Sequence, residues 1–109
     1  MERYFIDDER DPPKDGNQWV VVRSYDEFFK HMKGEIFFPQ FISFDHDLGE
    51  PKELDGFAIA KQMVLRDMDC RIRFPGKFDF LVHSENPIGK ENIEGLLNSY
   101  LKVKKCLQY

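Results

Sequence analysis

The stretch Phe41–Gly49, which reads FISFDHDLG, decides how the rest of the chain is interpreted. Its first four residues favour a buried β-strand, and an Asp-His-Asp triplet and a glycine-containing turn follow directly. Ionised carboxylates are rarely buried unless they are paired or bound to a metal, because their desolvation costs several kcal/mol. We therefore expect the triplet at the carboxyl end of a strand, where it faces solvent, a cation or a substrate.

Length and composition predict one domain that spans residues 1–109. The chain is 41% hydrophobic and contains 11 Phe, which is ample material for one core. No apolar run approaches the roughly 20 residues of a membrane helix, and the N-terminus has no signal-peptide pattern. Cys70 and Cys106 lack metal-ligand spacing. We therefore expect a cytoplasmic protein with reduced thiols and no membrane partner.

The charge pattern bears on the partners of the protein. The net charge of −4 argues against general DNA binding. Acidic side chains are concentrated in residues 7–11 and 45–55, and both segments directly follow candidate strands. This placement predicts that the acids serve a site rather than a uniformly solvated surface.

Hydrophobic patterning predicts that strands alternate with helices. Ser24 and Glu27 form a capping box for a first helix that we expect to stop at Gly34, and Pro87 suits the first position of the last helix. Residues 9–18, which include two consecutive prolines, are expected to be a loop. The strands are expected at residues 3–6, 19–23, 41–45 and 78–82, and a middle helix at residues 53–69.

This order predicts an α/β fold, a three-layer flavodoxin-like arrangement with a mostly parallel four-stranded sheet and its first helix replaced by a loop. Right-handed crossovers place the first strand beside the third, and ligands of such sheets bind beyond the carboxyl ends of the strands at that point. The residues that end their strands at this edge are Asp7, Asp8, Asp45, His46, Asp47, His83 and Ser84.

The acids at this edge are candidate metal ligands. Asp7, Asp8 and Asp45 offer hard oxygen ligands from two neighbouring strands, which suits Mg²⁺ or Mn²⁺. Asp47 lies two residues beyond Asp45 and, in an extended chain, points the same way. It is therefore a further ligand or a base, or alternatively it caps the turn at Gly49.

The remaining polar residues at this edge suit a phosphate. His46 and His83 can act as general base and general acid, or alternatively are structural. Ser84, Asn86 and Lys90 stand at the start of the last helix, where exposed N–H groups bind anions, so we expect them to bind phosphate. The alternative is that Ser84 or Asn86 caps the helix.

Three motifs carry a resemblance to a known family, and together they span most of the chain. They are Asp7-Asp8-Glu9-Arg10, the segment from Ser43 to Gly49, and the segment from Val82 to Gly89. The sequence is similar to the cyclic-phosphate processing receiver domains of bacteria and bacteriophages, a divergent branch of the two-component receiver fold. The chain departs from ordinary receivers because no fifth strand with its lysine follows residue 86.

The resemblance implies a metal-dependent phosphoesterase (a hydrolase) that processes cyclic phosphates on nucleotides or RNA ends. In receivers the acidic pair and the third-strand acid hold Mg²⁺, which here are Asp7, Asp8 and Asp45. One alternative is a non-catalytic receiver-like module that binds a nucleotide or a protein partner, since the receiver lysine is missing. Another is a phosphoacceptor domain that is modified at Asp45.

Overall fold

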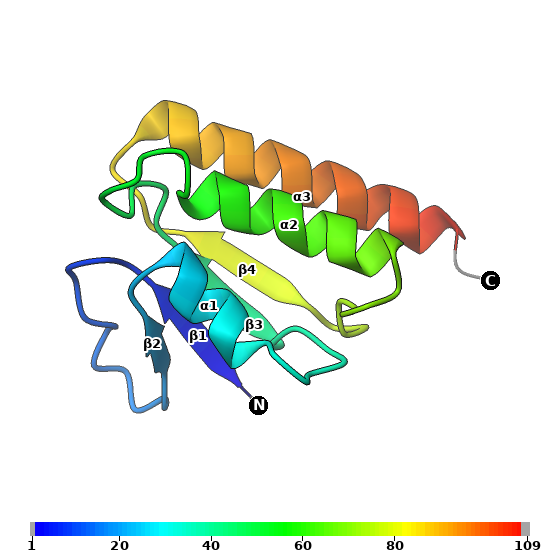
Figure 1. The fold of residues 1–109 in the computed structure, drawn as a ribbon, viewed down its shortest axis with the longest axis horizontal. Helices are drawn as coiled ribbons and strands as arrows, with labels where there is room; N and C mark the ends of the chain where they lie inside the picture. The colour runs from blue at the N-terminus through cyan, green and yellow to red at the C-terminus, as the bar shows by residue number, and fades with distance from the viewer. Residues whose placement is uncertain (1, 108–109) are drawn as a thin grey trace.

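The computed structural model describes the chain from Glu2 to Leu107 and its side chains as far as Lys104. Four strands and three helices follow one another in the predicted order (Figure 1). They are β1 (Arg3–Ile6), β2 (Val20–Val22), α1 (Tyr25–His31), β3 (Phe41–Phe44), α2 (Gly56–Met68), β4 (Asp79–Val82) and α3 (Pro87–Leu107). The predicted receiver-like α/β fold is confirmed.

The sheet has the strand order β2-β1-β3-β4, and all its strands are parallel. The first strand lies beside the third, as the sequence predicts. The register pairs Ile6 with Phe44 and Phe44 with Val82, so β1, β3 and β4 all end at the same level. As a result, the residues that follow these three strands are neighbours at one edge of the sheet.

The three helices form one layer on one face of the sheet (Figure 1). The connections from β2 to β3 and from β3 to β4 run in the same direction across the sheet, and right-handed crossovers then place α1 and α2 on the same side. The strand residues Tyr4, Ile6, Ile42 and Phe44 belong to one apolar core with the buried residues of all three helices. Burial of this core is the main stabilising term of the fold.

The other face of the sheet is covered in part by the segment between β1 and β2. This connection crosses the sheet in the opposite direction, and it contains no helix, as predicted. Trp19 at its end packs edge-on against Phe5 and Phe41, with ring centroids 5.9 Å apart in each pair. The Arg3 guanidinium lies 5.0 Å from the centroid of the Phe41 ring. The third layer is therefore a loop with an aromatic anchor.

The structure corrects the start of the middle helix, which the sequence places at residue 53. Helix α2 begins at Gly56, because the Asp55 side chain caps it by accepting a hydrogen bond from the Ala58 N–H at 2.8 Å. The Gly56 N–H also donates to the His46 carbonyl at 2.7 Å. A Cβ at position 56 would lie 2.0 Å from the Asp45 carbonyl oxygen, so only glycine allows this approach.

The start of the first helix agrees with one half of the predicted capping box, because Glu27 accepts a hydrogen bond from the Arg23 N–H at 3.1 Å and not from Ser24. The helix ends at His31, before the predicted stop at Gly34. Ser24 accepts a hydrogen bond from the Glu27 N–H at 3.1 Å, and Gly34 has φ +83° just beyond the helix. Cys70 is a free thiol, as expected, whereas the side chain of Cys106 lies outside the described part of the chain. Within residues 2–107 no helix is long and apolar enough to cross a membrane.

A buried carboxylate joins α2 to α3 at the end of the molecule opposite the strand ends. Asp67 is 5% exposed and accepts hydrogen bonds from the Tyr100 hydroxyl, from Lys104 Nζ at 2.6 Å and from the Phe74 N–H at 2.9 Å. Burial raises the pKa of Asp67, but these donors outweigh that effect and lower it overall. Asp67 is therefore ionised and fully paired.

Candidate functional site

Three buried or half-buried side chains meet where β1, β3 and β4 end. Asp7, Asp45 and His83 each offer one ligand atom, and these atoms all lie within 4.8 Å of one another. Asp7 is 1% exposed and Asp45 is 6% exposed. The common level of the strand ends produces this cluster, because each of the three residues directly follows the last residue of its strand.

His83 is fixed on three sides. Its Nε2 lies 3.0 Å from Asp7 Oδ2, and its Nδ1 lies 2.7 Å from Ser43 Oγ. The Phe5 ring stacks on the imidazole with centroids 4.4 Å apart and an angle of 5° between the planes. No role was predicted for Ser43 from the sequence. Its hydroxyl in an otherwise apolar strand is a signal that could have identified it.

Asp7 and Asp45 experience opposite electrostatic effects. Burial raises the pKa of Asp7, but hydrogen bonds from the backbone N–H groups of Arg10 and Glu9 and from His83 outweigh it and lower the pKa overall. For Asp45, burial and the charge of Asp7 raise the pKa, and a hydrogen bond from Ser84 offsets this only in part. Asp45 is thus a buried carboxylate held against a second negative charge.

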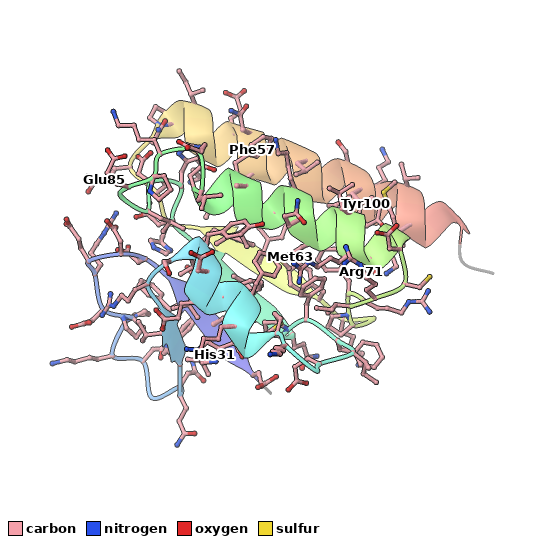
Figure 2. The ribbon with its side chains drawn as sticks, in the orientation of Figure 1. His31, Phe57, Met63, Arg71, Glu85 and Tyr100 are labelled. Atoms are coloured by element: carbon pink, nitrogen blue, oxygen red, sulfur yellow. The ribbon has the colours of Figure 1, made fainter. Side chains whose placement is uncertain are left out.

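A pocket of about 350 Å³ opens beside this cluster at the ends of the strands. Figure 2 shows Glu85, which belongs to its lining, at the end of the molecule opposite Arg71. The lining residues are Asp8, Glu9, Arg10, Asp45, Asp47, Gly49, Ser84, Glu85 and Asn86. Asp8 is half-buried and contributes to this wall, outside the group formed by Asp7, Asp45 and His83.

Of the described residues that line this pocket, Arg10 is the one with a basic side chain. Its Nε lies 3.3 Å from Asp7 Oδ2, and its Nη1 lies 3.9 Å from the exposed carboxylate of Glu85. The Arg10 side chain is 48% exposed, so a ligand can reach it. Arg10 stands in a motif that the sequence singles out, but no role was predicted for it.

The three predicted phosphate-binding residues at the start of α3 do not all lie in the pocket. Asn86 caps the helix, because its Oδ1 accepts a hydrogen bond from the Gly89 N–H at 2.9 Å. Ser84 Oγ accepts one from the Asn86 N–H at 3.1 Å. Both residues line the pocket, whereas Lys90 is exposed and its side chain is not part of the lining. The capping alternative therefore applies to Asn86.

His46 lies apart from the His83 cluster, between two acids. Its Nδ1 is 3.0 Å from Asp47 Oδ1, and its Nε2 is 3.3 Å from Asp55 Oδ2. The hydrogen bond from His46 outweighs the small effect of burial and lowers the pKa of Asp47. His46 lines a second pocket of about 430 Å³, which shares Asp47 and Gly49 with the first. Asp47 therefore connects His46 to the pocket beside the cluster of Asp7, Asp45 and His83.

A protein-family model matches most of the chain. The family model described as "Cyclic-phosphate processing Receiver domain" matches residues 3–99. This match covers all four strands and most of α3. No match was found among curated proteins or among solved structures. The chain belongs to the family of cyclic-phosphate processing receiver domains.

Proposed function

We propose that the protein is a metal-dependent phosphoesterase that opens a cyclic phosphate on a nucleotide or an RNA end. The observation that carries this proposal is the group formed by Asp7, Asp45 and His83 beside a pocket at the strand ends. The family name supports the processing of a cyclic phosphate. Five carboxylates and one guanidinium line the pocket, so a phosphate would need a bound cation to offset this negative charge.

The donor set fits a divalent cation. Two carboxylates and one imidazole bind Mn²⁺ well, and the carboxylates also suit Mg²⁺. The repulsion between Asp7 and Asp45 is a cost that a cation between them would remove. Asp8, predicted from the sequence as a ligand, would act from the pocket wall. When bound, the cation would neutralise negative charge on the phosphate oxygens.

The side chains of the pocket would bind and orient the phosphate. The Arg10 guanidinium would exchange its contact with the exposed Glu85 for a phosphate oxygen, to which it can donate two hydrogen bonds. The hydroxyl of Ser84 and the N-terminus of α3 would donate to the other oxygens. Lys90 would contribute longer-range attraction from the first turn of the helix.

Proton transfer would fall to His46 and Asp47. In the reaction, a water oxygen bonds to phosphorus, one ring P–O bond breaks, the departing alkoxide takes up a proton from the Asp47–His46 pair, and the proton lost by the water restores that pair. Asp47 is 68% exposed and lies on the wall shared by the two pockets, so it can pass a proton from His46 to that oxygen. The product is a phosphomonoester.

The test is incubation with 2′,3′- and 3′,5′-cyclic nucleotides and with RNA that ends in a cyclic phosphate, each with Mg²⁺, with Mn²⁺ and with chelator. We expect a phosphomonoester only with a metal ion and its loss in Asp45→Asn and His83→Ala. Asp69→Asn, a change at an exposed carboxylate, is the matched control. Unchanged substrate in every reaction, or full activity of His83→Ala, would rule out this mechanism.

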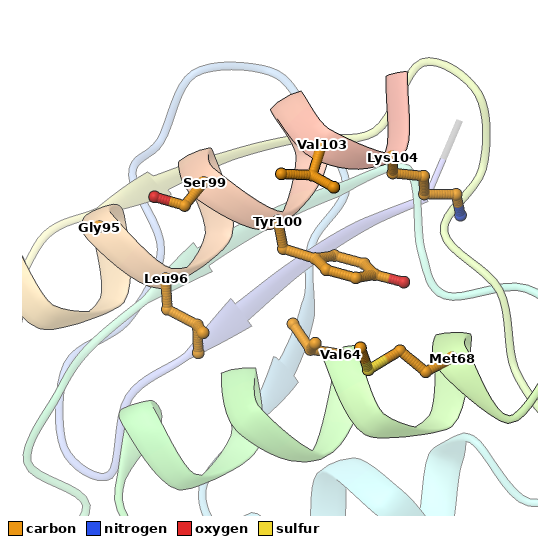
Figure 3. A pocket seen from close by; sticks show the side chains of 8 residues that line it. All are labelled: Val64, Met68, Gly95, Leu96, Ser99, Tyr100, Val103 and Lys104. Carbon is orange, nitrogen blue, oxygen red and sulfur yellow. The ribbon is translucent and has the colours of Figure 1, made fainter. Parts of the chain in front are cut away.

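A second candidate is a non-catalytic module that binds a protein partner. It is favoured by an apolar groove of about 520 Å³ between α2 and α3, shown in Figure 3. The groove is lined by Val64, Met68, Gly95, Leu96, Ser99, Tyr100, Val103 and Lys104. Turnover of a cyclic nucleotide supports the enzyme, whereas calorimetric binding of a protein partner that is lost in Leu96→Asp, without any turnover, supports the module.

A further inference from the structure

Ser43 lies beside the imidazole of His83 on the face of the sheet opposite the helices. Its Oγ is 2.7 Å from Nδ1 of the ring, while Nε2 of the same ring faces Asp7 at 3.0 Å. The order serine, histidine, aspartate resembles that of a nucleophilic triad. Ser43 is only 3% exposed, however, so its hydroxyl cannot meet a substrate. Its effect must pass through His83.

We propose that Ser43 is a positioning residue that allows His83 to change tautomer when a divalent cation binds. This inference rests on the metal site of the proposed function. Without a cation, the His83 Nε2–H donates to Asp7, and Nδ1 accepts a hydrogen bond from the Ser43 hydroxyl. With a cation, the lone pair of Nε2 becomes a ligand, and Nδ1–H donates to Ser43 Oγ.

A hydroxyl suits this exchange because it can both donate and accept a hydrogen bond. For a neutral imidazole the change is an exchange of tautomers. A proton leaves Nε2 to solvent and another reaches Nδ1 from solvent, so the charge of the ring is unchanged. A side chain without a hydroxyl at position 43 would leave Nδ1 without its partner in both states, in a site with little access to water.

The two hydrogen bonds of His83 disfavour the simpler alternative, in which the ring turns over. The two rings are nearly parallel, at 5°, and the His83 side chain is 17% exposed. A half-turn of the ring in this slot would put carbon atoms where the two nitrogens now lie and would break both hydrogen bonds. His83 therefore changes its role by moving a proton while its ring stays in place.

The matched variants are Ser43→Thr and Ser43→Val, which have the same shape and differ in the hydroxyl. Removing the partner behind a metal-binding imidazole weakens metal binding by about 10- to 100-fold. We expect this loss for Ser43→Val and Ser43→Ala, and affinity close to wild type for Ser43→Thr. Asn98→Ala removes an exposed polar side chain on α3 and should leave metal binding unchanged. If the two variants with larger side chains do not fold, Ser43→Ala can still be compared with the wild type.

The experiment combines calorimetry with Mn²⁺ and nitrogen NMR of the histidine side chains with Zn²⁺, which is diamagnetic. We expect the His83 proton on Nε2 without Zn²⁺ and on Nδ1 with it, while His31 and His46 keep their signals. Equal affinity of Ser43→Val and Ser43→Thr, or a proton that stays on Nε2 in the Zn²⁺ complex, would overturn the role of Ser43 and leave the metal site intact. A wild-type protein that binds neither ion would overturn the metal-dependent function as well.

Discussion

Gly89 in the first turn of α3 lies directly against the imidazole of His46. A Cβ at position 89 would come within 2.3 Å of the ring, closer than packed atoms can approach. Alanine normally stabilises a helix relative to glycine by about 1 kcal/mol, but Gly89→Ala would push His46 away from Asp47 and Asp55. We expect this variant to be less stable by about 1–3 kcal/mol in denaturant unfolding.

The matched control for that variant is Gly95→Ala in the same helix. No atom lies within 4 Å of a Cβ at position 95, so the helix preference acts alone there. Gly95→Ala should be more stable than wild type by roughly 0.5–1 kcal/mol. If the two variants shift stability in the same direction, the contact between Gly89 and His46 does not control the position of the ring.

Asp67 makes stability depend on acid pH. Its pKa is lower in the folded protein than in the unfolded chain, so its contribution is complete above its ordinary pKa and is lost as the pH falls through the folded value. We expect Asp67→Asn to cost about 3 kcal/mol at pH 7, because it leaves the half-buried Lys104 without its partner. The difference from wild type should shrink below pH 4, as measured by urea unfolding at each pH. An equal difference at every pH would contradict this account, and Asp69→Asn serves as the exposed control.

Asp45→Asn should separate stability from metal binding. The variant removes the repulsion from Asp7, which raises the pKa of Asp45, and its amide oxygen can still accept the His46 N–H. The metal-free variant should gain on the order of 1 kcal/mol, since the two carboxylates lie within 4.8 Å of each other and like charges at such a distance repel by about that much even in water. Addition of Mn²⁺ should then raise the Tm of the wild type, measured by thermal unfolding, and leave the Tm of the variant unchanged. If Asp45→Asn is less stable than wild type without metal, repulsion between Asp7 and Asp45 does not destabilise the fold.

Arg10→Gln should weaken the binding of a phosphomonoester product. Arg10 supplies the basic side chain of the pocket, and its exposed half can reach a ligand. Removal of a charged hydrogen bond to a phosphate costs about 1.5–3 kcal/mol, which corresponds to a rise in Kd of about 10- to 100-fold. Calorimetry with a nucleoside monophosphate measures this change, and Lys14→Gln on the β1–β2 loop is the control. Equal affinity of both variants would show that Arg10 does not bind the phosphate.

Much of the fold could be predicted because the signals are local. The capping box at Ser24, the proline at the start of α3 and the apolar runs of the strands each specify an element without help from the rest of the chain. Alternation of strands and helices then leaves few possible topologies, since crossovers are right-handed. The start of α2 was predicted three residues early, because residues 53–55 also suit a helix and only the Asp55 cap excludes them.

The site could be predicted only to the level of the strand ends. The sequence correctly places Asp7, Asp45 and His83 at one edge, but the hydrogen bond between Ser43 and His83 joins residues 40 positions apart. The partner of His46 was also not visible, since Asp55 comes near it only through the turn into α2. Side-chain contacts of this kind depend on the register of the sheet, which no local pattern encodes.

That register has a consequence for the assembly of the site during folding. Asp7, Asp45 and His83 come from three separate strands, and a shift of any one strand by one residue would send its side chain to the helix-covered face. Misaligned sheets would therefore lack the complete ligand set. A cation that requires all three ligands would bind only the correctly aligned sheet. Its binding would therefore favour the native register over misaligned ones.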